Sequence, residues 1–521
     1  MASVPAPSVS AMHAALRRWT LVLALAAALA TLIAHFVFQA ESATTLIRYP
    51  YGVDYGEGIV WQQMRNIMRG TGYAPIGVFP AVVYHYPPVF HVIVGITARV
   101  LGTDELATGR AVSWIATLGC ATLIGAFVMT LGRERKDRLA GLIAGLLAAL
   151  MFMSTDPVMD WAPLMRVDMP AYLFGLAGLV LANRAVDRPG MLWAAAVCFT
   201  LAVYTKQVSL AAPAAAFVGL LVVRPRRAWA LAAITTTLGG TLLLLLSWAT
   251  GGGFLRHIIL YNVNRVRPEQ IGALVYPIHM HILYVVLACA GAVLLVRRIR
   301  ALWPVRTTHA AEVTTLVAAI TYFTLKTLML AMIMKSGSSL NYVIEWFCAV
   351  AILAGVAVRP AVELTLAYVR GRDIRPGASV LVPASLFLAV AIQVQELPRR
   401  PDTMDIDDAR AQAARLAPLV ALIRATPKPV ISDDMTLLIR AGRDVQWEPA
   451  IAAELGAAGR YDQAAFARMI RNKRFGLFIT EGDRGGAMFK QRYNPPVAEA
   501  MASAYPNTSM LGRFTIYAPR R

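Results

Sequence analysis

The sequence predicts a mainly α-helical, polytopic transmembrane domain followed by a small α/β domain. Of its 521 residues, 57% are hydrophobic and only 15% are charged, and the mean hydropathy is +0.55. One soluble core cannot enclose that much apolar surface, so most of it must face lipid. The formal net charge of +20 therefore indicates basic cytoplasmic loops rather than nucleic-acid binding. The four cysteines all lie in apolar runs, which predicts neither disulfides nor a zinc site.

The first apolar run, 19–38, has the roughly 20 residues that a helix needs to cross a bilayer and exceeds a signal-peptide core. We therefore expect it to be an uncleaved first helix. Ten further runs bring the expected total to about eleven crossings. They lie at 105–131, 138–155, 169–186, 190–206, 208–223, 228–250, 278–296, 311–333, 341–358 and 377–394.

Basic clusters set the expected topology. With the N-terminus inside and the sides alternating, all five clusters fall in the cytoplasm, as the positive-inside rule requires. This agreement holds only if the apolar stretch 84–102 makes no net crossing, so we expect a juxtamembrane or re-entrant segment there. The C-terminus then lies in the periplasm or its equivalent. The clusters are 132–138, 183–188, 224–227, 297–300 and 359–375.

The character of the chain changes after about residue 395, where the apolar runs shorten and the charge becomes mixed. We expect a transmembrane domain over 1–395, with its first external loop at 39–104, and an extracytoplasmic soluble α/β domain over 396–521. Strands are expected at 428–434, 474–482 and 512–521, and helices at 405–425, 461–473 and 495–505.

Two acids in "DYGEG", Asp54 and Glu57, stand three residues apart in the first external loop. On a helix from about 55 to 69 both carboxylates could point at one substrate. The same spacing is also that of a capping box, in which both side chains accept free backbone N–H groups. The local pattern leaves both interpretations open, and they coexist if only one acid caps the helix.

Cationic side chains fall in other external loops. Lys206 lies in a very short turn between two apolar helices, where a solvated charge has little room. Arg166 has Asp160 and Asp168 close by in sequence, so a structural ion pair is an equal alternative for it. Cations facing a shared cavity would hold a lipid phosphate by charge-assisted hydrogen bonds. The same side also carries Arg256, Arg265 and Lys335.

Two further segments carry polar residues next to apolar runs. In "YHYPPVF" (84–90) the paired prolines and the aromatic residues Tyr84 and Tyr86 are typical of a helix that starts at the membrane surface. His85 is more typical of an interfacial side chain than of a metal ligand. In "KSGSSLNYVIE" (335–345), Asn341 and Glu345 share a helix face, and the carboxylate must be paired or face a polar cavity.

The order of these motifs resembles the GT-C superfamily, integral-membrane glycosyltransferases that use polyprenyl-phosphate-linked sugars; protein O-mannosyltransferases and the lipid A aminoarabinose transferase belong to it. The resemblance covers about 15–395 and consists of "DYGEG", "YHYPPVF" and the external "RVD" (166–168), in that order. "YTKQ" and "SLNYVIE" are similar to segments of bacterial members of uncharacterised specificity. This chain has "RVD" where many members have Arg-Pro-Asp. It also lacks a Trp-Trp-Asp motif, which argues against transfer of a whole oligosaccharide to asparagine.

The resemblance implies an inverting transfer from a polyprenyl-phosphate sugar donor to an extracytoplasmic lipid, glycan or protein at a bacterial inner membrane. Asp54 would be the general base, and Glu57 would orient it or the acceptor, or help ligate a divalent cation. Lys206 and Arg166 would hold the donor phosphate, with Arg256 or Arg265 as alternates. The expected substrate cavity comprises Tyr55, Tyr84, His85, Tyr86, Asp168, Asn341 and Glu345.

Two other functions compete with this interpretation. A transporter or lipid flippase should show inverted repeats, broken helices and charges near the membrane midplane, and the sequence has little of these. A non-catalytic GT-C relative acting as a scaffold would keep the fold without the transfer activity.

Overall fold

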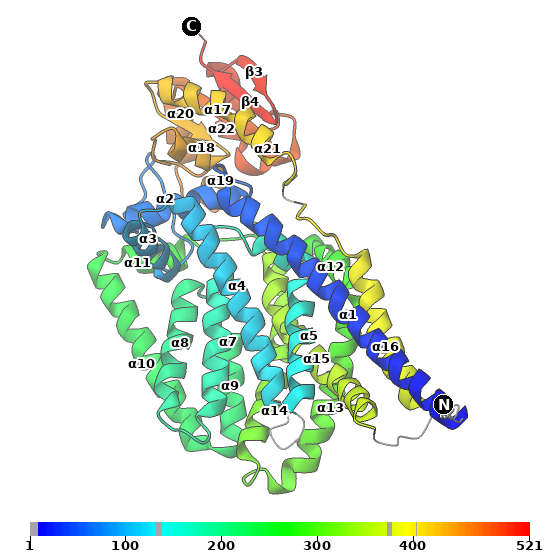
Figure 1. The fold of residues 1–521 in the computed structure, drawn as a ribbon. Coiled ribbons are helices and arrows are strands. Elements are labelled where there is room, and N and C mark those ends of the chain that lie inside the picture. Colours follow the sequence, from blue (N-terminus) through cyan, green and yellow to red (C-terminus); the bar gives the residue numbers. More distant parts are fainter. Residues whose placement is uncertain (1–8, 132–137, 372–377, 403, 521) are drawn as a thin grey trace.

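The computed structural model describes residues 9–131, 138–371, 378–402 and 404–520. Its helices form a long bundle, and a small α/β unit covers one end (Figure 1). This confirms the predicted fold class. The elements before residue 397 are α1 (Val9–Arg48), α2 (Tyr55–Met68), α3 (Val89–Leu101), α4 (Glu105–Thr130), α5 (Arg138–Met153), α6 (Asp156–Trp161), α7 (Asp168–Arg184), α8 (Met191–Thr205), α9 (Ala211–Val223), α10 (Pro225–Ala249), α11 (Gly253–Leu255), η1 (Arg256–Leu260), η2 (Pro268–Leu274), α12 (Val275–Met280), α13 (Ile282–Leu302), η3 (Trp303–Val305), α14 (Ala310–Met329), η4 (Leu330–Met334), α15 (Asn341–Val369) and α16 (Ala378–Glu396).

Within the described ranges, six helices are long and apolar enough to cross a membrane, and shorter apolar helices run beside them (Figure 1). The chain is thus an integral membrane protein. The six differ in their surroundings: the apolar window of α15 is 72% buried, whereas that of α10 is only 6% buried. The bundle is therefore built around α15, and α10 at its edge presents apolar side chains to lipid. The basic cluster 132–138 lies, apart from Arg138, outside the described residues, as does 372–375.

Glycines allow the bundle helices to approach closely. A Cβ on Gly145 of α5 would lie 2.6 Å from the carbonyl oxygen of Gly125 on α4. A Cβ on Gly291 of α13 would lie within 3 Å of the backbone of Leu353 on α15. Lipid tails are as apolar as leucine, so membrane helices gain stability from such close packing rather than from the hydrophobic effect between them.

The stretch 84–102 contains α3, which packs against α2 and α4 at the covered end of the bundle (Figure 1). Its 13 residues make a helix of about 20 Å, which is shorter than a bilayer core of about 30 Å. The backbone of Gly102, in the left-handed region, ends the helix.

The C-terminal unit contains a four-stranded sheet in the order β1-β2-β4-β3, with β1 parallel to β2 and the other pairs antiparallel. All three predicted strands and all three predicted helices are present. The elements missed are short: β3 is an exposed edge strand, and α18, α19 and α21 have six to nine residues. The elements are α17 (Ala409–Ala425), β1 (Val430–Ser432), α18 (Met435–Arg440), α19 (Pro449–Ala457), α20 (Gln463–Arg471), β2 (Leu477–Glu481), α21 (Ala487–Arg492), α22 (Pro495–Ala504), β3 (Asn507–Leu511) and β4 (Phe514–Ala518).

The C-terminal unit is joined to the start of α2. The Thr436 hydroxyl accepts a hydrogen bond from the Gly52 N–H at 2.7 Å, and Arg440 donates to the Pro50 carbonyl at 2.6 Å. Gly58 leaves room for this contact, since a Cβ there would lie 2.7 Å from the backbone nitrogen of Thr436. The acidic motif is therefore enclosed between the bundle and the C-terminal unit.

Candidate active site

A cavity of about 270 Å³ lies where the bundle meets the C-terminal unit. Segments far apart in the sequence contribute to it: the first turns of α2, the loop before α3, the end of α8, the loop before α15 and the start of α19. Most of the residues that line it have polar side chains. The lining residues are Asp54, Tyr55, Gly56, Ile59, Val60, Gln63, His85, Tyr86, Trp161, Arg166, Lys206, Gln207, Val208, Asn262, Asn264, Lys335, Ser336, Gly337, Ser338, Ser339, Tyr342, Glu448, Ala450 and Ile451.

Asp54 is the N-cap of α2 and also faces the cavity. Its Oδ1 atom accepts the Gly56 N–H at 3.0 Å and lies 3.2 Å from Nη1 of Arg166. Its Oδ2 atom makes no hydrogen bond within the part of the chain that the structure describes. Burial raises the pKa of the Asp54 carboxyl, and the Arg166 guanidinium opposes that rise. Asp54 therefore combines a fixed orientation with one free oxygen that can accept a proton.

Glu57, three residues later, points the other way. Its side chain is 0% exposed and does not line the cavity. Both of its oxygens pair with Arg110, at 2.8 and 2.7 Å, and they also accept the N–H groups of Met165 and Val53. Burial alone would raise the pKa of Glu57, but Arg110 and these hydrogen bonds hold it below its usual value. These contacts support the capping role for Glu57 and not the catalytic one.

Lys206 lies on the cavity wall but is already neutralised. Its ammonium nitrogen is 2.5 Å from Oδ1 of Asp168 and 3.1 Å from the Tyr172 hydroxyl. It also lies 4.9 Å from the ring centre of Tyr342, which is a cation–π contact. Lys206 is therefore held in a fixed position on the wall, and Asp168 offsets its charge.

Lys335 was expected on this side of the membrane without an assigned role. Its ammonium group donates to Oδ1 of Asn262 at 3.0 Å and has no carboxylate partner among the described residues. Burial lowers the pKa of Lys335, and the neighbouring charge of Lys206 lowers it further. Of the cavity's cations, Lys335 has the least compensated charge.

The other two predicted phosphate ligands lie outside the cavity. The guanidinium of Arg256 is exposed and donates to the Gly251 carbonyl at 2.9 Å. Arg265 pairs with Ser336 through its backbone, and its side chain is exposed. Neither lines the cavity, so the structure does not bring these two alternates to the candidate site.

Of the predicted cavity residues, Tyr55, His85 and Tyr86 line the wall. The Tyr55 hydroxyl accepts the Ala450 N–H at 3.1 Å, which ties the acidic motif to α19. Burial lowers the pKa of His85 to about 4, so this imidazole is neutral at physiological pH. Tyr84 lies behind the wall, where its hydroxyl accepts a hydrogen bond from Asn66 at 2.9 Å.

Asp168, Asn341 and Glu345 are also buried behind the cavity wall. Asn341 donates to Oδ1 of Asp168 at 2.8 Å, so these two residues hold Lys206 from behind. Glu345 pairs with Lys326 at 2.8 Å between α14 and α15. Its paired structural role, the alternative left open by the sequence, is thus the one its contacts support.

Glu448 is a cavity residue that the sequence did not reveal. It immediately precedes α19 and is only 6% exposed. Its carboxyl group makes no hydrogen bond or ion pair with any part of the chain that the structure covers. Burial raises its pKa to about 8, with Arg166 and Arg492 opposing the rise. The only local signal is Pro449, which marks a helix start and says nothing of a site.

The two acids of "DYGEG" do not offer a joint cation site. The Glu57 oxygens accept hydrogen bonds from four N–H groups, two of which belong to the charged Arg110 guanidinium. Across the described ranges, no group of three or more His, Cys, Asp or Glu side chains gathers as metal ligands would. The donor set around Asp54 therefore does not fit the divalent cation considered from the sequence.

No family model matches the sequence, and no curated protein matches it. Solved structures do. The structure of ArnT from Cupriavidus metallidurans bound to undecaprenyl phosphate superposes with a TM-score of 0.54 and 16% identity, covering 95% of this chain and 97% of that one. Archaeal oligosaccharyltransferase AglB from Archaeoglobus fulgidus, in complex with an inhibitory peptide and a dolichol-phosphate, gives 0.55 and 12%, with 95% and 74% covered.

Both similar structures have the GT-C fold, and the match extends over nearly the whole chain, including the C-terminal unit. The GT-C expectation is therefore confirmed for the fold. At 12–16% identity the likeness concerns the arrangement of the elements and not the chemistry. The chemistry has to be argued from the cavity itself.

Proposed function

We propose that this chain is an inverting membrane glycosyltransferase, which moves a sugar from a polyprenyl-phosphate donor to an acceptor hydroxyl of a lipid, glycan or protein. The observation that carries the proposal is the free Oδ2 atom of Asp54 in a cavity whose wall also holds Lys335, Lys206 and Arg166. The similar ArnT and AglB structures are complexes with undecaprenyl phosphate and with a dolichol-phosphate, respectively. This supports a lipid phosphate as the leaving group.

The transfer needs one proton acceptor and one positively charged pocket. The acceptor oxygen attacks the anomeric carbon from the face opposite the phosphate, and its proton passes to Asp54. The bond between that carbon and the phosphate oxygen breaks, and the polyprenyl phosphate leaves with the electron pair. A positioned base contributes about 10²–10⁴-fold to such a step, and fixed cations stabilise the developing phosphate charge.

The contacts of each cavity residue determine its role in the proposed transfer. Arg166 opposes the rise that burial causes in the pKa of Asp54, so it favours the ionised form that can accept a proton. Lys335 binds the phosphate directly, because no carboxylate competes for its ammonium group among the described residues. Lys206 is held in a fixed position by Asp168, which offsets its charge.

Glu448 serves the acceptor end of the same cavity. It precedes α19 of the C-terminal unit, whereas Lys335 lies in the loop before α15 of the bundle, so the two groups come from different walls of the cavity. A carboxyl group with a pKa of about 8 is largely protonated at pH 7 and can both donate and accept a hydrogen bond. Sugar and acceptor hydroxyls require such a partner.

The arrangement of basic residues supports an extracytoplasmic cavity. Helix α7 begins at Asp168 beside the cavity and ends at Arg184, and α8 returns to Lys206. Arg184 and the cluster at Arg224, between α9 and α10, therefore lie at the opposite end of the bundle (Figure 1). Basic residues mark the cytoplasmic side. A polyprenyl donor confined to the outer leaflet can then present its sugar to Asp54.

The test compares substitutions at two aspartates that each cap the N-terminus of a helix. Asp54→Asn removes the base, and Asp104→Asn changes another N-cap aspartate that pairs with an arginine, Arg440, but lies outside the cavity. Each purified protein is reconstituted in nanodiscs with a radiolabelled undecaprenyl-phosphate sugar and a membrane extract as acceptor. We expect Asp54→Asn to lose label transfer by about 10²–10⁴-fold while still binding undecaprenyl phosphate. Asp104→Asn should transfer like the wild type.

Other outcomes separate the competing functions. Transfer that is unchanged in Asp54→Asn would contradict the assignment of the base. Movement of the labelled lipid between leaflets without transfer would favour the flippase, and neither activity in the wild type would favour the scaffold.

A further inference from the structure

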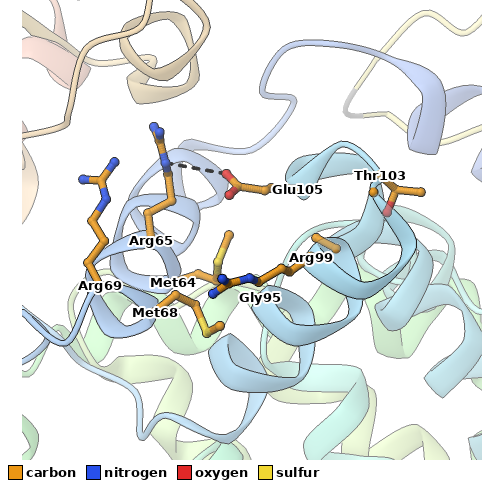
Figure 2. A pocket seen from close by; sticks show the side chains of 10 residues that line it. Met64, Arg65, Met68, Arg69, Gly95, Arg99, Thr103 and Glu105 are labelled. Carbon is orange, nitrogen blue, oxygen red and sulfur yellow. Dashed lines mark ion pairs between the residues drawn. The ribbon is translucent and has the colours of Figure 1, made fainter.

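A second pocket, of about 400 Å³, lies between α2, α3 and the start of α4 (Figure 2). We call it the arginine pocket, after Arg65, Arg69 and Arg99. Figure 2 shows Arg99 extending over Gly95 toward the two methionines of α2, with Arg65 and Arg69 on the opposite rim. The lining residues are Met64, Arg65, Met68, Arg69, Gly95, Ala98, Arg99, Gly102, Thr103 and Glu105.

The cavity that Asp54 faces is called the reaction cavity below. The arginine pocket and the reaction cavity lie on opposite faces of α2. The residues of α2 that line the cavity are Tyr55, Gly56, Ile59, Val60 and Gln63, whereas those that line the pocket are Met64, Arg65, Met68 and Arg69. With a rotation of about 100° per residue in a helix, the centres of the two sets are separated by roughly half a turn of the helix circumference. A ligand in the arginine pocket would therefore not occupy the reaction cavity.

Two of the three guanidinium groups make no hydrogen bond with the residues that the structure describes. Arg69 is committed to Asp444, at 3.0 and 3.1 Å. Arg65 lies 3.6 Å from Glu105 and 3.8 Å from Asp444, distances too long for hydrogen bonds. The nearer carboxylate oxygen of Glu105 already accepts the Trp61 indole N–H at 2.5 Å.

Arg99 makes no hydrogen bond and no ion pair with the residues that the structure describes. Three arginines thus face two carboxylates, Glu105 on the wall and Asp444 beside it, and the balance is positive. An arginine fork matches the geometry of a phosphate, and charge-assisted bonds of this kind are about twice as strong as neutral ones.

The floor of the pocket is apolar and depends on a missing side chain. Met64 is 1% exposed and packs under the pocket beside Met68 and Ala98. A Cβ on Gly95 would come within 2.4 Å of Met68, so a larger residue would fill the floor. The pocket therefore combines an apolar base with a cationic rim, which suits an amphiphile.

The outer face of α3 indicates where this amphiphile comes from. Ile96, Val100 and Leu101 are 50%, 76% and 65% exposed on a helix that borders the bundle at its covered end (Figure 1). A patch of large apolar side chains next to arginines is typical of a helix that lies in the membrane interface. Arg99 stands within this patch, so the pocket is accessible from the lipid surface.

We propose that the arginine pocket binds the phosphate headgroup of an anionic membrane lipid, with Arg65 and Arg99 as the ligands and the acyl chains along Ile96 and Val100. This site is separate from the reaction cavity and does not depend on the proposed function.

The test is native mass spectrometry of the purified full chain, titrated in detergent with phosphatidylglycerol or with phosphatidylcholine. We expect the wild type to retain phosphatidylglycerol preferentially, and Arg99→Ala to weaken it about tenfold, as the loss of one charge-assisted contact predicts. Arg65→Ala/Arg99→Ala should abolish the preference. Arg48→Ala is the matched control, since Arg48 is an exposed arginine at the end of α1 outside the pocket.

Arg99→Ala removes no hydrogen bond or ion pair within the described structure, so its folding should be intact. Gly95→Leu offers a second way to block the floor. Equal retention of the two lipids by the wild type, or undiminished preference in Arg65→Ala/Arg99→Ala, would overturn the proposal. Displacement of phosphatidylglycerol by millimolar inorganic phosphate would also overturn it, because the site would then belong to a free anion.

Discussion

Two carboxylate–arginine pairs stand three residues apart at the start of α2, and they differ in what surrounds them. Glu57 and Arg110 are both 0% exposed, and four N–H donors fill the carboxylate. Asp54 and Arg166 have side chains 20% and 14% exposed and approach each other to 3.2 Å. The first pair is complete and stabilises the loop. The second leaves a free oxygen facing a cavity, which is what a proton acceptor needs.

The completed pair should give the largest effect when it is broken. Arg110→Met leaves Glu57 buried without its cation, and breaking a buried pair in this way costs about 3–5 kcal/mol. Arg110 also donates to the carbonyls of Leu46, Tyr49 and Tyr51, so the loop before α2 would lose its anchor.

We expect Arg110→Met to aggregate or to elute in the void volume in fluorescence-detected size-exclusion chromatography. Glu57→Gln/Arg110→Met should recover part of the monodisperse peak, because the unpaired charge is gone. A monodisperse and thermally unchanged Arg110→Met would contradict the structural role assigned to this pair.

Opening the incomplete pair should change the pH dependence of transfer instead. Arg166 lowers the pKa of Asp54 against the effect of burial, so Arg166→Gln should raise that pKa further. Asp54 would then become protonated at a higher pH when the solution is acidified. We expect the acid limb of the transfer profile to move to higher pH, with activity partly restored under alkaline conditions. An acid limb that does not move would mean that Asp54 is not the group being titrated.

Removing the uncompensated cation should give a smaller change, confined to binding. Lys335→Ala deletes one charge-assisted contact to the donor phosphate, which we expect to weaken undecaprenyl phosphate binding by about tenfold. Microscale thermophoresis in nanodiscs measures this. Lys490→Ala, which removes an exposed lysine of α21 outside the cavity, should bind like the wild type. Equal affinities for the two variants would remove Lys335 from the phosphate site.

The smallest effect is expected at Glu448. Its pKa is raised from 4.5 to about 8, so its contribution to stability is fully present below pH 4.5 and is lost as the pH rises through about 8. Between pH 7 and 9 this amounts to about 1 kcal/mol. Glu448→Gln should therefore show a flatter dependence of the thermal midpoint on pH than the wild type, as followed by differential scanning fluorimetry. Parallel curves would contradict a buried, proton-binding Glu448.

The fold class could be predicted from the sequence because a membrane-spanning helix is apolar along its whole length. The apolar runs that form α4, α13 and α15 can be recognised without knowing which helices they contact. The edge strand β3 was missed because its exposed residues have no apolar alternation, and it is held only by pairing with β4.

The candidate site was only partly predictable, for a different reason. The local pattern correctly suggested that Asp54 and Glu57 lie at a helix start, but Arg110 decides their difference and lies 53 residues from Glu57. Glu448 reaches the cavity only because α19 folds back over the first loop, through contacts such as that of Ala450 with Tyr55. Such partnerships depend on tertiary structure, and no short motif contains them.

The contact between the first loop and the C-terminal unit also sets an order of events during biosynthesis. Ala81 forms a parallel bridge with Trp447, and Gly52 binds Thr436, which lies 384 residues further along the chain. A nascent chain that has inserted every helix through α16 still lacks these partners and the Glu448 wall. The cavity therefore closes only after the C-terminal unit has been synthesised and has packed against the first loop, so a ribosome-bound intermediate lacks a complete candidate site.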